Sequence, residues 1–550
     1  MRLYHGFLWA LVLAAGPTVL VTAAPPASVP SATATVASGV VVGTTTTLPS
    51  ATTAVNKFLG IPFAAPPERF SPAQEPAAWS DPLEVSAFKP ACIQQFKYPV
   101  ESQEFTNLIF NNPPPEESED CLYLNVFAPA APVPAGGRAV LFWIYGGGLT
   151  FGNAGQPFYD GSSFAANQDI IVVTANYRTN VFGFPSSPEL PETGQNLGFL
   201  DQRFALDWVQ KNIESFGGDP KKVTVAGQSA GAESVDALVT SFATDPPFRG
   251  AILQSGQMSI FPLEPGNGSL PQWNSLSAAL GCDEEASALA CVRAVPATKI
   301  KGVIEQNSLV FNPVTDEVTF VSRPSAKRAV RKIANVPLFL GSTSQEGRVF
   351  TYGQDNLTAF LNGLIPNRPV IQKALAAAYP IGSPGISNTN DQMSQIFTEF
   401  IFQCPAALLS HLSAAAGHPT WRYYFNASFS NLQPVPGLGA FHSSEIPLVF
   451  GTYPEGPTAQ EIGLSQFMQT AWARFVKSPS AGPGWNRIGP LPGTHLGVLG
   501  SNGGSGVETT PELPLDTRCA IYAPIYGLSK LGVGLGRRGV DGRGHMDWAR

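Results

Sequence analysis

The chain has 550 residues, of which 44% are hydrophobic and only 13% are charged, and its net charge is −7. An average soluble protein carries roughly 25% charged residues, so this composition predicts a large buried core and a surface rich in uncharged polar residues. The acidic balance argues against nucleic acid and anionic membranes as partners.

The N-terminus predicts export. Arg2 precedes a short apolar run at residues 7–15, and small residues follow at 21–24. This layout is typical of a secretory signal peptide, residues 1–23, because the run is too short to span a bilayer. The sequence therefore predicts a secreted, extracellular protein without a transmembrane segment.

No linker divides the remaining chain. Residues 24–53 are rich in Pro, Ala, Ser and Thr, and we expect a low-complexity segment there, followed by a single domain at residues 54–527. Prolines and glycines interrupt residues 54–92, which are expected to be loop-like. The glycine- and arginine-rich end, residues 528–550, is expected to be disordered.

Six cysteines in a chain predicted to be exported indicate disulfides. Metal ligation is disfavoured, because no pair has C-x-x-C spacing and no histidines cluster near them. Spacing alone favours only the short loop from Cys282 to Cys291, and the other pairings stay open. The cysteines are Cys92, Cys121, Cys282, Cys291, Cys404 and Cys519. Three N-glycosylation sequons agree with export, at Asn267, Asn356 and Asn426.

The segment between Cys92 and Cys121 contains several aromatic residues, among them Phe96 and Phe105, and reaches Pro113–Pro115 near its end. Aromatic side chains in such a loop usually fold back onto the core. The alternative is that residues 93–120 form a cover over an apolar cleft.

Residues 139–145 form a continuous apolar run of strand length, which predicts a parallel strand buried on both faces. The run leads directly into Gly146, Gly147 and Gly148. Glycines at the end of such a strand let the backbone approach a ligand with its N–H groups unobstructed, as an oxyanion hole requires. A plain tight turn is the alternative.

A second buried strand is predicted at residues 169–176, and an amphipathic helix at 200–216. A third strand ends in Gly227-Gln-Ser-Ala-Gly231, which has the G-x-S-x-G pattern of a nucleophile elbow. In such an elbow the two glycines avoid collisions across a strained turn that exposes the Ser229 hydroxyl. Strand, helix and strand form a βαβ unit.

Further short apolar runs predict strands that end at the same rim, at residues 250–255, 336–341 and 421–425. Apolar residues from Leu464 to Val476 recur with helical spacing and predict a helix packed on the sheet.

A serine nucleophile needs a base and an orienting carboxylate. Among the histidines, His442 follows a glycine-rich loop after a predicted strand, and His495 also lies in a predicted loop. Glu346 follows the strand at 336–341, which gives the order Ser, acid, His of α/β-hydrolases. Spacing alone leaves His495 open as the base. It also leaves two other acids open, Asp316 and Asp355.

Together these segments resemble the type-B carboxylesterase/lipase family, which includes cholinesterases and fungal lipases, over residues 54–525. The resemblance is carried by residues 60–63, 118–125, 143–148, 176–178, 212–220, 251–256, 345–347 and 442–446, and by the elbow itself. It implies an α/β-hydrolase fold, with a large, mostly parallel sheet covered by helices on both faces.

The resemblance also implies roles for single residues. Ser229, Glu346 and His442 would form the triad, and Ser255 would support the acid. The N–H groups of the oxyanion hole would come from Gly147, Gly148 and Ala230. The implied disulfides are Cys92–Cys121, Cys282–Cys291 and Cys404–Cys519.

The chain departs from the family at three places. Gln228 precedes the serine where many relatives carry glutamate, and Leu149 replaces a common phenylalanine. No tryptophan lies between Cys92 and Cys121, so a quaternary ammonium would lose its cation–π partner and choline esters are doubtful substrates.

The expected function is a serine carboxylic ester hydrolase that acts on a small-molecule or lipid ester without metal or cofactor. One alternative is an interfacial lipase whose lid is the 93–120 segment. A non-catalytic binding protein on the same scaffold is less favoured, because all three triad residues are present. An amidase or peptidase stays open, since the same triad cleaves amides.

Overall fold

The computed structural model describes residues 31–260, 269–490, 493–522 and 524–526. The predicted signal peptide at 1–23, the C-terminal tail at 528–550 and the sequon at Asn267 lie outside the described residues. Within the described ranges, no helix combines the length and apolar character needed to cross a bilayer.

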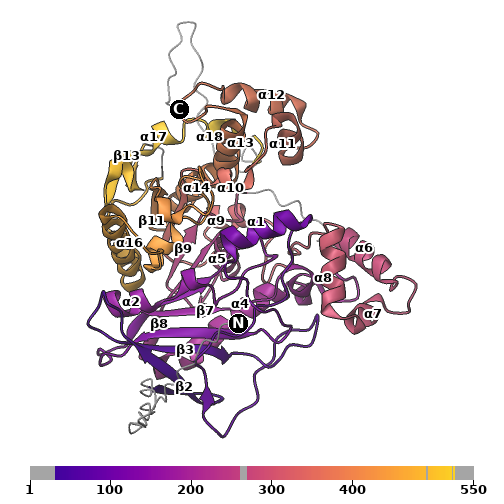
Figure 1. Ribbon diagram of the computed structural model, residues 1–550, viewed down its shortest axis with the longest axis vertical. Helices are drawn as coiled ribbons and strands as arrows, with labels where there is room; N and C mark the ends of the chain where they lie inside the picture. Colours follow the sequence, from indigo (N-terminus) through magenta and orange to yellow (C-terminus); the bar gives the residue numbers. More distant parts are fainter. Residues whose placement is uncertain (1–30, 261–268, 491–492, 523, 527–550) are drawn as a thin grey trace, which may run out of the picture.

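One mixed sheet runs through the molecule, and its centre is parallel (Figure 1). Its thirteen strands, counted over the described residues, follow the order β1-β2-β3-β5-β7-β6-β8-β9-β10-β11-β12-β13, with β4 beside β2. Neighbours from β7 to β12 are parallel, and the flanking pairs along this path are antiparallel. The strands are β1 (Ser31–Val36), β2 (Gly39–Thr46), β3 (Val55–Pro62), β4 (Leu83–Glu84), β5 (Tyr123–Pro129), β6 (Arg138–Ile144), β7 (Ile171–Ala175), β8 (Gly218–Gln228), β9 (Gly250–Gln254), β10 (Leu338–Thr343), β11 (Thr420–Phe425), β12 (His495–Leu499) and β13 (Val507–Pro511).

Helices cover both faces of the sheet and extend beyond it. In Figure 1, α6 to α8 project at one side and α11 to α13 at the top. The α-helices are α1 (Val100–Phe110), α2 (Ser162–Gln168), α3 (Asn180–Gly183), α4 (Leu197–Asn212), α5 (Ala230–Ser241), α6 (Leu270–Leu280), α7 (Ala288–Ala294), α8 (Ala297–Gln306), α9 (Pro324–Ala329), α10 (Gly347–Phe350), α11 (Leu357–Leu364), α12 (Pro369–Ala378), α13 (Thr389–Phe397), α14 (Cys404–Ala415), α15 (Ile446–Phe450), α16 (Ala459–Lys477), α17 (Glu512–Leu515) and α18 (Cys519–Tyr522). A π-helical turn, η4 (Thr398–Gln403), joins α13 to α14.

Successive residues of β6 enter two separate cores. Val140 and Phe142 belong to the core on one face of the sheet, which α4 and α5 cover. Leu141 and Trp143 belong to the core on the other face, where α16 contributes Trp472. Every residue of β6 is buried, as expected of a central parallel strand with both faces covered.

The carboxyl ends of the central strands lie at one edge of the sheet. Ile144 of β6 is in register with Gly227 of β8, and Gln228 is in register with Gln254 of β9. Gly341 of β10 pairs with Gln254 in turn. The segments that follow these strands therefore emerge side by side, and they carry the glycine triplet, Ser229, Ser255 and Glu346.

Three expectations for the N-terminal part of the chain are wrong. The sheet begins at β1 and β2, inside the segment 24–53 that we expected to be low-complexity, so the ordered domain starts before residue 54. β3 lies in the stretch expected to be loop-like, and α1 forms part of the expected loop at 93–120. Small and β-branched residues at 31–46 suit an edge hairpin, and the biased composition concealed this pattern.

Candidate active site

Ser229 occupies a sharp turn between β8 and α5. Its backbone has φ 56° and ψ −126°, and its N–H donates to the Gln254 carbonyl at 2.8 Å. A Cβ added at Gly227 would lie 2.4 Å from the Gly231 backbone, and one at Gly231 would lie 2.0 Å from the Ile144 carbonyl oxygen. The two glycines are therefore required by close backbone approach, and the turn leaves Ser229 partly exposed beside buried neighbours.

Glu346 and His442 are in direct contact, although 96 residues separate them. His442 Nδ1 lies 2.6 Å from Glu346 Oε2. The other carboxylate oxygen accepts hydrogen bonds from Ser255 Oγ at 2.6 Å and from the Thr343 N–H at 2.7 Å. A buried carboxylate fixed in this way favours the tautomer that carries its proton on Nδ1, so Nε2 is left as an acceptor.

The Nε2 edge of His442 faces the end of β8. Gln228 Nε2 lies 3.0 Å from His442 Nε2, and Ser229 is the next residue in the chain. Three phenylalanine rings pack around the imidazole, with centroid distances of 4.7 Å for Phe402, 5.1 Å for Phe350 and 6.2 Å for Phe110. The imidazole of His442 is thus held between a carboxylate, an amide and apolar rings.

The glycine triplet lies directly beside the elbow, since a Cβ on Gly146 would be 2.9 Å from Ser229 Cβ. Gly147 and Gly148 have φ of 106° and 62°, a region that favours glycine. Over the described residues, neither of their N–H groups has a recorded acceptor. Ala230 begins α5, so its N–H also lacks a partner within the helix. Free donors beside Ser229 match the requirements of an oxyanion hole.

The rival candidates lie elsewhere. Asp316 is buried and accepts hydrogen bonds from Thr319, and Asp355 is exposed. His495 is exposed and is the first residue of β12, not part of a loop as expected. His418, a buried histidine that was not among the rivals, has its pKa lowered to about 4 by burial, and no contact joins it to a candidate acid within the described part of the chain.

Sequence reasoning missed Glu445, a second buried carboxyl near Glu346 and His442. It accepts a hydrogen bond from Gln254 Nε2 at 3.1 Å. Burial, and then the nearby Glu346 charge, raise the pKa of Glu445 to about 8. The signal that could have identified Glu445 from the sequence is its position three residues after His442. The aromatic wall of Phe350 and Phe402 was also missed, because Phe402 reaches His442 through a π-helical turn that no simple periodicity predicts.

Helix α1 lies above this site. Its Ile109 shares a small apolar cluster with Val349 and Phe441, and Phe441 directly precedes His442. The outward side of the same segment carries exposed apolar side chains, namely Tyr98, Val100 and Leu108, at 59%, 52% and 43% of their full exposure. Phe96, Phe105 and Phe110 stack on rings of other segments, so these aromatic residues fold back onto the core, and the cover over an apolar cleft stays a prediction.

The six cysteines form three disulfides, Cys92–Cys121, Cys282–Cys291 and Cys404–Cys519. These are the pairings that the family resemblance implies. The Cys92–Cys121 bridge closes the segment that contains α1. Of the sequons, Asn356 and Asn426 are exposed.

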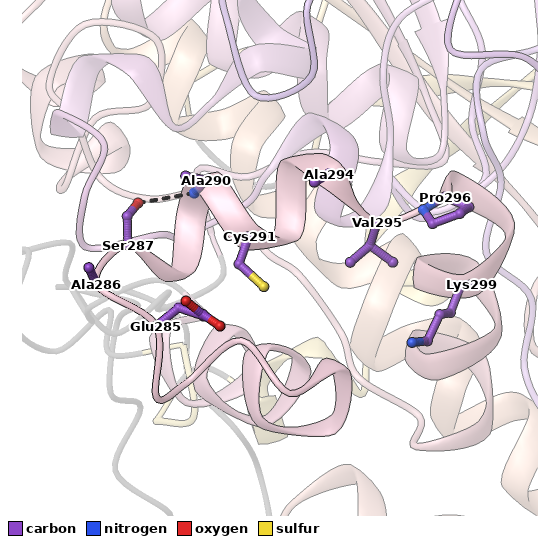
Figure 2. Close-up of a pocket in the computed structure, with 9 residues that line it drawn as sticks. All are labelled: Glu285, Ala286, Ser287, Ala290, Cys291, Ala294, Val295, Pro296 and Lys299. Atoms are coloured by element: carbon purple, nitrogen blue, oxygen red, sulfur yellow. Dashed lines mark hydrogen bonds between the residues drawn. The ribbon is translucent and has the colours of Figure 1, made fainter.

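A hollow of about 600 Å³ lies beside the Cys282–Cys291 disulfide, on α7 and α8 (Figure 2). Its one hydroxyl, that of Ser287, donates to Glu189 and accepts from the Ala290 N–H. Ser287 therefore caps α7, and the hollow contains none of the candidate catalytic residues. Over the described residues, no group of three or more His, Cys, Asp or Glu side chains is arranged to hold a metal ion.

A strand–serine–helix turn at the carboxyl edge of a mainly parallel sheet, covered by helices on both faces, defines an α/β-hydrolase fold. The sequence pattern of the Carboxylesterase family matches residues 30–498. The chain belongs to this family and is a carboxylic ester hydrolase.

Similar proteins agree with this assignment. A para-nitrobenzyl esterase of Bacillus subtilis is 34% identical over 77% of this chain and 86% of its own length. Secreted lipase 5 of Gibberella zeae is 31% identical over 80% of this chain and 85% of its own. A chlorogenic acid esterase of Aspergillus niger is 32% identical over 80% of this chain and 81% of its own.

Proposed function

We propose that the protein is a secreted serine carboxylic ester hydrolase that works through an acyl-enzyme, with Ser229 as nucleophile, His442 as base and Glu346 as the orienting acid. The observation that carries this proposal is the 2.6 Å contact of His442 Nδ1 with a fully buried Glu346, which directs Nε2 toward the elbow. The elbow backbone and the free amides of Gly147 and Gly148 support it.

In the first step, Ser229 Oγ attacks the ester carbonyl while His442 Nε2 takes its proton. The carbonyl oxygen becomes an oxyanion, and the N–H groups of Gly147, Gly148 and Ala230 stabilise it, with each donor contributing about 3 kcal/mol. The imidazolium then gives its proton to the leaving alcohol, and the acyl group stays on Ser229. In the second step, a water molecule or another alcohol attacks the acyl-enzyme by the same route.

The test is hydrolysis by single variants of the folded protein. Ser229→Ala should lower turnover by on the order of a millionfold. His442→Ala should lose activity to a similar extent, whereas His495→Ala should keep it, because His495 is exposed on β12. Retained activity in Ser229→Ala, or loss in His495→Ala alone, would reject the triad.

The substrate proposed is an uncharged ester. The rings of Phe110, Phe350 and Phe402 make the surroundings of the base apolar, which suits neutral acyl or alcohol groups. A panel of esters from acetate to oleate would establish the acyl-chain length that fits. Matched ester and amide substrates would measure the amidase activity that the same triad permits.

Interfacial lipase activity is the second candidate, and exposed apolar side chains at the start and end of α1 favour it. Tyr98, Val100 and Leu108 would meet an oil surface, while Ile109 packs against Phe441 beside His442. In this case activity rises sharply when a soluble ester is replaced by an emulsion. Leu108→Ser should reduce that rise and leave hydrolysis of soluble acetate esters unchanged. Equal rates with and without an interface would support the simple esterase.

Secretion is proposed from three features. The N-terminal residues have the layout of a signal peptide, the described cysteines are all in disulfides, and one relative is a secreted lipase. Expression of the full chain in a eukaryotic host should place it in the medium, with a mature N-terminus near residue 24. Glycosidase treatment should then lower its mass if Asn356 or Asn426 is glycosylated. Retention inside the cell, with residues 1–23 still attached, would contradict the proposal.

A further inference from the structure

The Nε2 edge of His442 already has a partner in the resting site. Gln228 is 2% exposed and is the last residue of β8, and its carboxamide nitrogen lies 3.0 Å from Nε2. Over the described residues, this is the one polar group recorded within hydrogen-bond distance of that atom. Ser229 follows Gln228 in the chain, so the residue that contacts Nε2 is the direct neighbour of the proposed nucleophile.

We propose that Gln228 is a positioning residue whose uncharged carboxamide holds His442 Nε2 between turnovers and keeps the base unprotonated to a lower pH than a carboxylate at the same place would. The proposal rests on the function proposed above, since it assigns Gln228 a role in the use of His442 as a base.

Hydrogen-bond chemistry explains the choice of an amide. With Glu346 accepting from Nδ1, the neutral imidazole offers a lone pair on Nε2, and the NH₂ group of Gln228 can donate to it. When the Ser229 hydroxyl donates to Nε2 instead, the amide must give up this position. After proton transfer, Nε2 carries a proton, and rotation of the amide by half a turn presents the Gln228 carbonyl oxygen as an acceptor. The carboxamide can therefore serve both protonation states of the base.

A carboxylate at this place would act differently, because it carries charge and has no hydrogen to donate. It would stabilise only the imidazolium form, because a negative charge beside Nε2 favours the protonated ring. The base would then be protonated, and so inactive, over more of the acidic range.

The other charged groups near His442 are paired with opposite charges, have raised pKa values or are exposed. Glu346 is therefore the main charge that acts on the imidazole. Arg348 on α10 forms an ion pair with Asp391, and Glu399 on η4 forms one with Arg518. The remaining acids near the site are Glu445 before α15 and Glu233 on α5, and burial raises the pKa values of these two groups to about 8 and about 7. On α1, Glu101 and Glu104 are exposed. A second carboxylate at position 228 would therefore be a large change in the charge around the base.

The test compares pH profiles of kcat/KM for the wild-type enzyme, Gln228→Glu and Gln228→Met. Gln228→Glu should move the acid limb upward by about one to three pH units and keep the activity at high pH within about tenfold. Gln228→Met keeps the volume but removes the hydrogen bond, so it should lower kcat about three- to tenfold with KM and the acid limb unchanged. Gln466→Glu, on the exposed side of α16, adds the same charge far from the site and should leave the profile unchanged.

The melting temperature of each variant shows whether it is folded. If Gln228→Glu does not fold, Gln228→Met still tests positioning through the separation of kcat from KM. The proposal would be overturned if the acid limb of the Gln228→Glu pH profile coincided with that of the wild type. It would also be overturned if Gln228→Met had the wild-type kcat. Failure of the proposed function is recognised separately, because Ser229→Ala would then retain the wild-type rate whatever residue occupies position 228.

Discussion

Gly231→Ala tests whether the elbow is held by backbone contact with β6. A Cβ at this position would lie 2.0 Å from the Ile144 carbonyl oxygen and 2.8 Å from that of Tyr145. Ordinary carbon–oxygen contacts are longer than 3 Å, so β6 or α5 has to move. Overpacking of this kind costs about 1–3 kcal/mol, and contact with two backbone groups places the substitution at the upper end.

The displacement should reach the proposed oxyanion donors, because β6 leads directly into the glycine triplet. We expect kcat to fall about 100-fold, the effect of losing one well-placed donor. Unfolding entropy of roughly 2 cal/mol/K per residue over a chain of this size converts about 3 kcal/mol into a fall of about 3 °C in Tm. Scanning calorimetry and ester hydrolysis measure the two effects.

Gly302→Ala is the matched control. Gly302 lies inside α8, and no atom is within 4 Å of its added Cβ. Alanine should stabilise that helix by about 0.5–1 kcal/mol and leave kcat unchanged. A Gly231→Ala protein with wild-type Tm and wild-type kcat would refute the packing argument, whatever the control does.

Two further predictions concern stability. Removing the Cys404–Cys519 disulfide, with a sequence separation of 115, should lower the free energy of unfolding by about 5 kcal/mol. Removing Cys282–Cys291, with a separation of 9, should lower it by about 3 kcal/mol. Denaturant titration of the two double-alanine variants measures both losses, and the reverse order would contradict this prediction. Glu445→Gln should become more stable relative to the wild type as pH rises from 4.5 to 8, by up to about 1.4 kcal/mol per pH unit. The wild type loses stability over this range because its folded state retains a proton at Glu445 that the unfolded chain has already lost. A difference in unfolding free energy that did not change with pH would argue against the raised pKa of Glu445.

The local features of the site were predictable from the sequence because each has a local cause. The elbow needs glycines two residues before and after Ser229, and the proposed oxyanion segment needs glycines directly after a buried strand. Both requirements come from steric contact within a few residues. The central strands were predictable for a similar reason, since β6 is buried along its whole length and reads as a continuous apolar run.

The remaining features depend on contacts between distant segments. Nothing local distinguishes His442 from His495, and only strand order brings His442 to Glu346 across 96 residues. The contact of Gln228 with His442 joins residues 214 positions apart. β1 and β2 were missed because their stability comes from antiparallel pairing, which a composition rich in alanine, serine and threonine did not reveal.

The most direct test of the central claim is to identify the residue that becomes covalently modified. A fluorophosphonate reacts with activated serines, and mass spectrometry of the intact protein and its peptides measures both the number and the position of adducts. We predict one adduct per chain, on the peptide that contains Ser229, and essentially none in His442→Ala over the same time. An adduct on another serine, or equally fast labelling of Ser229→Ala, would contradict the account.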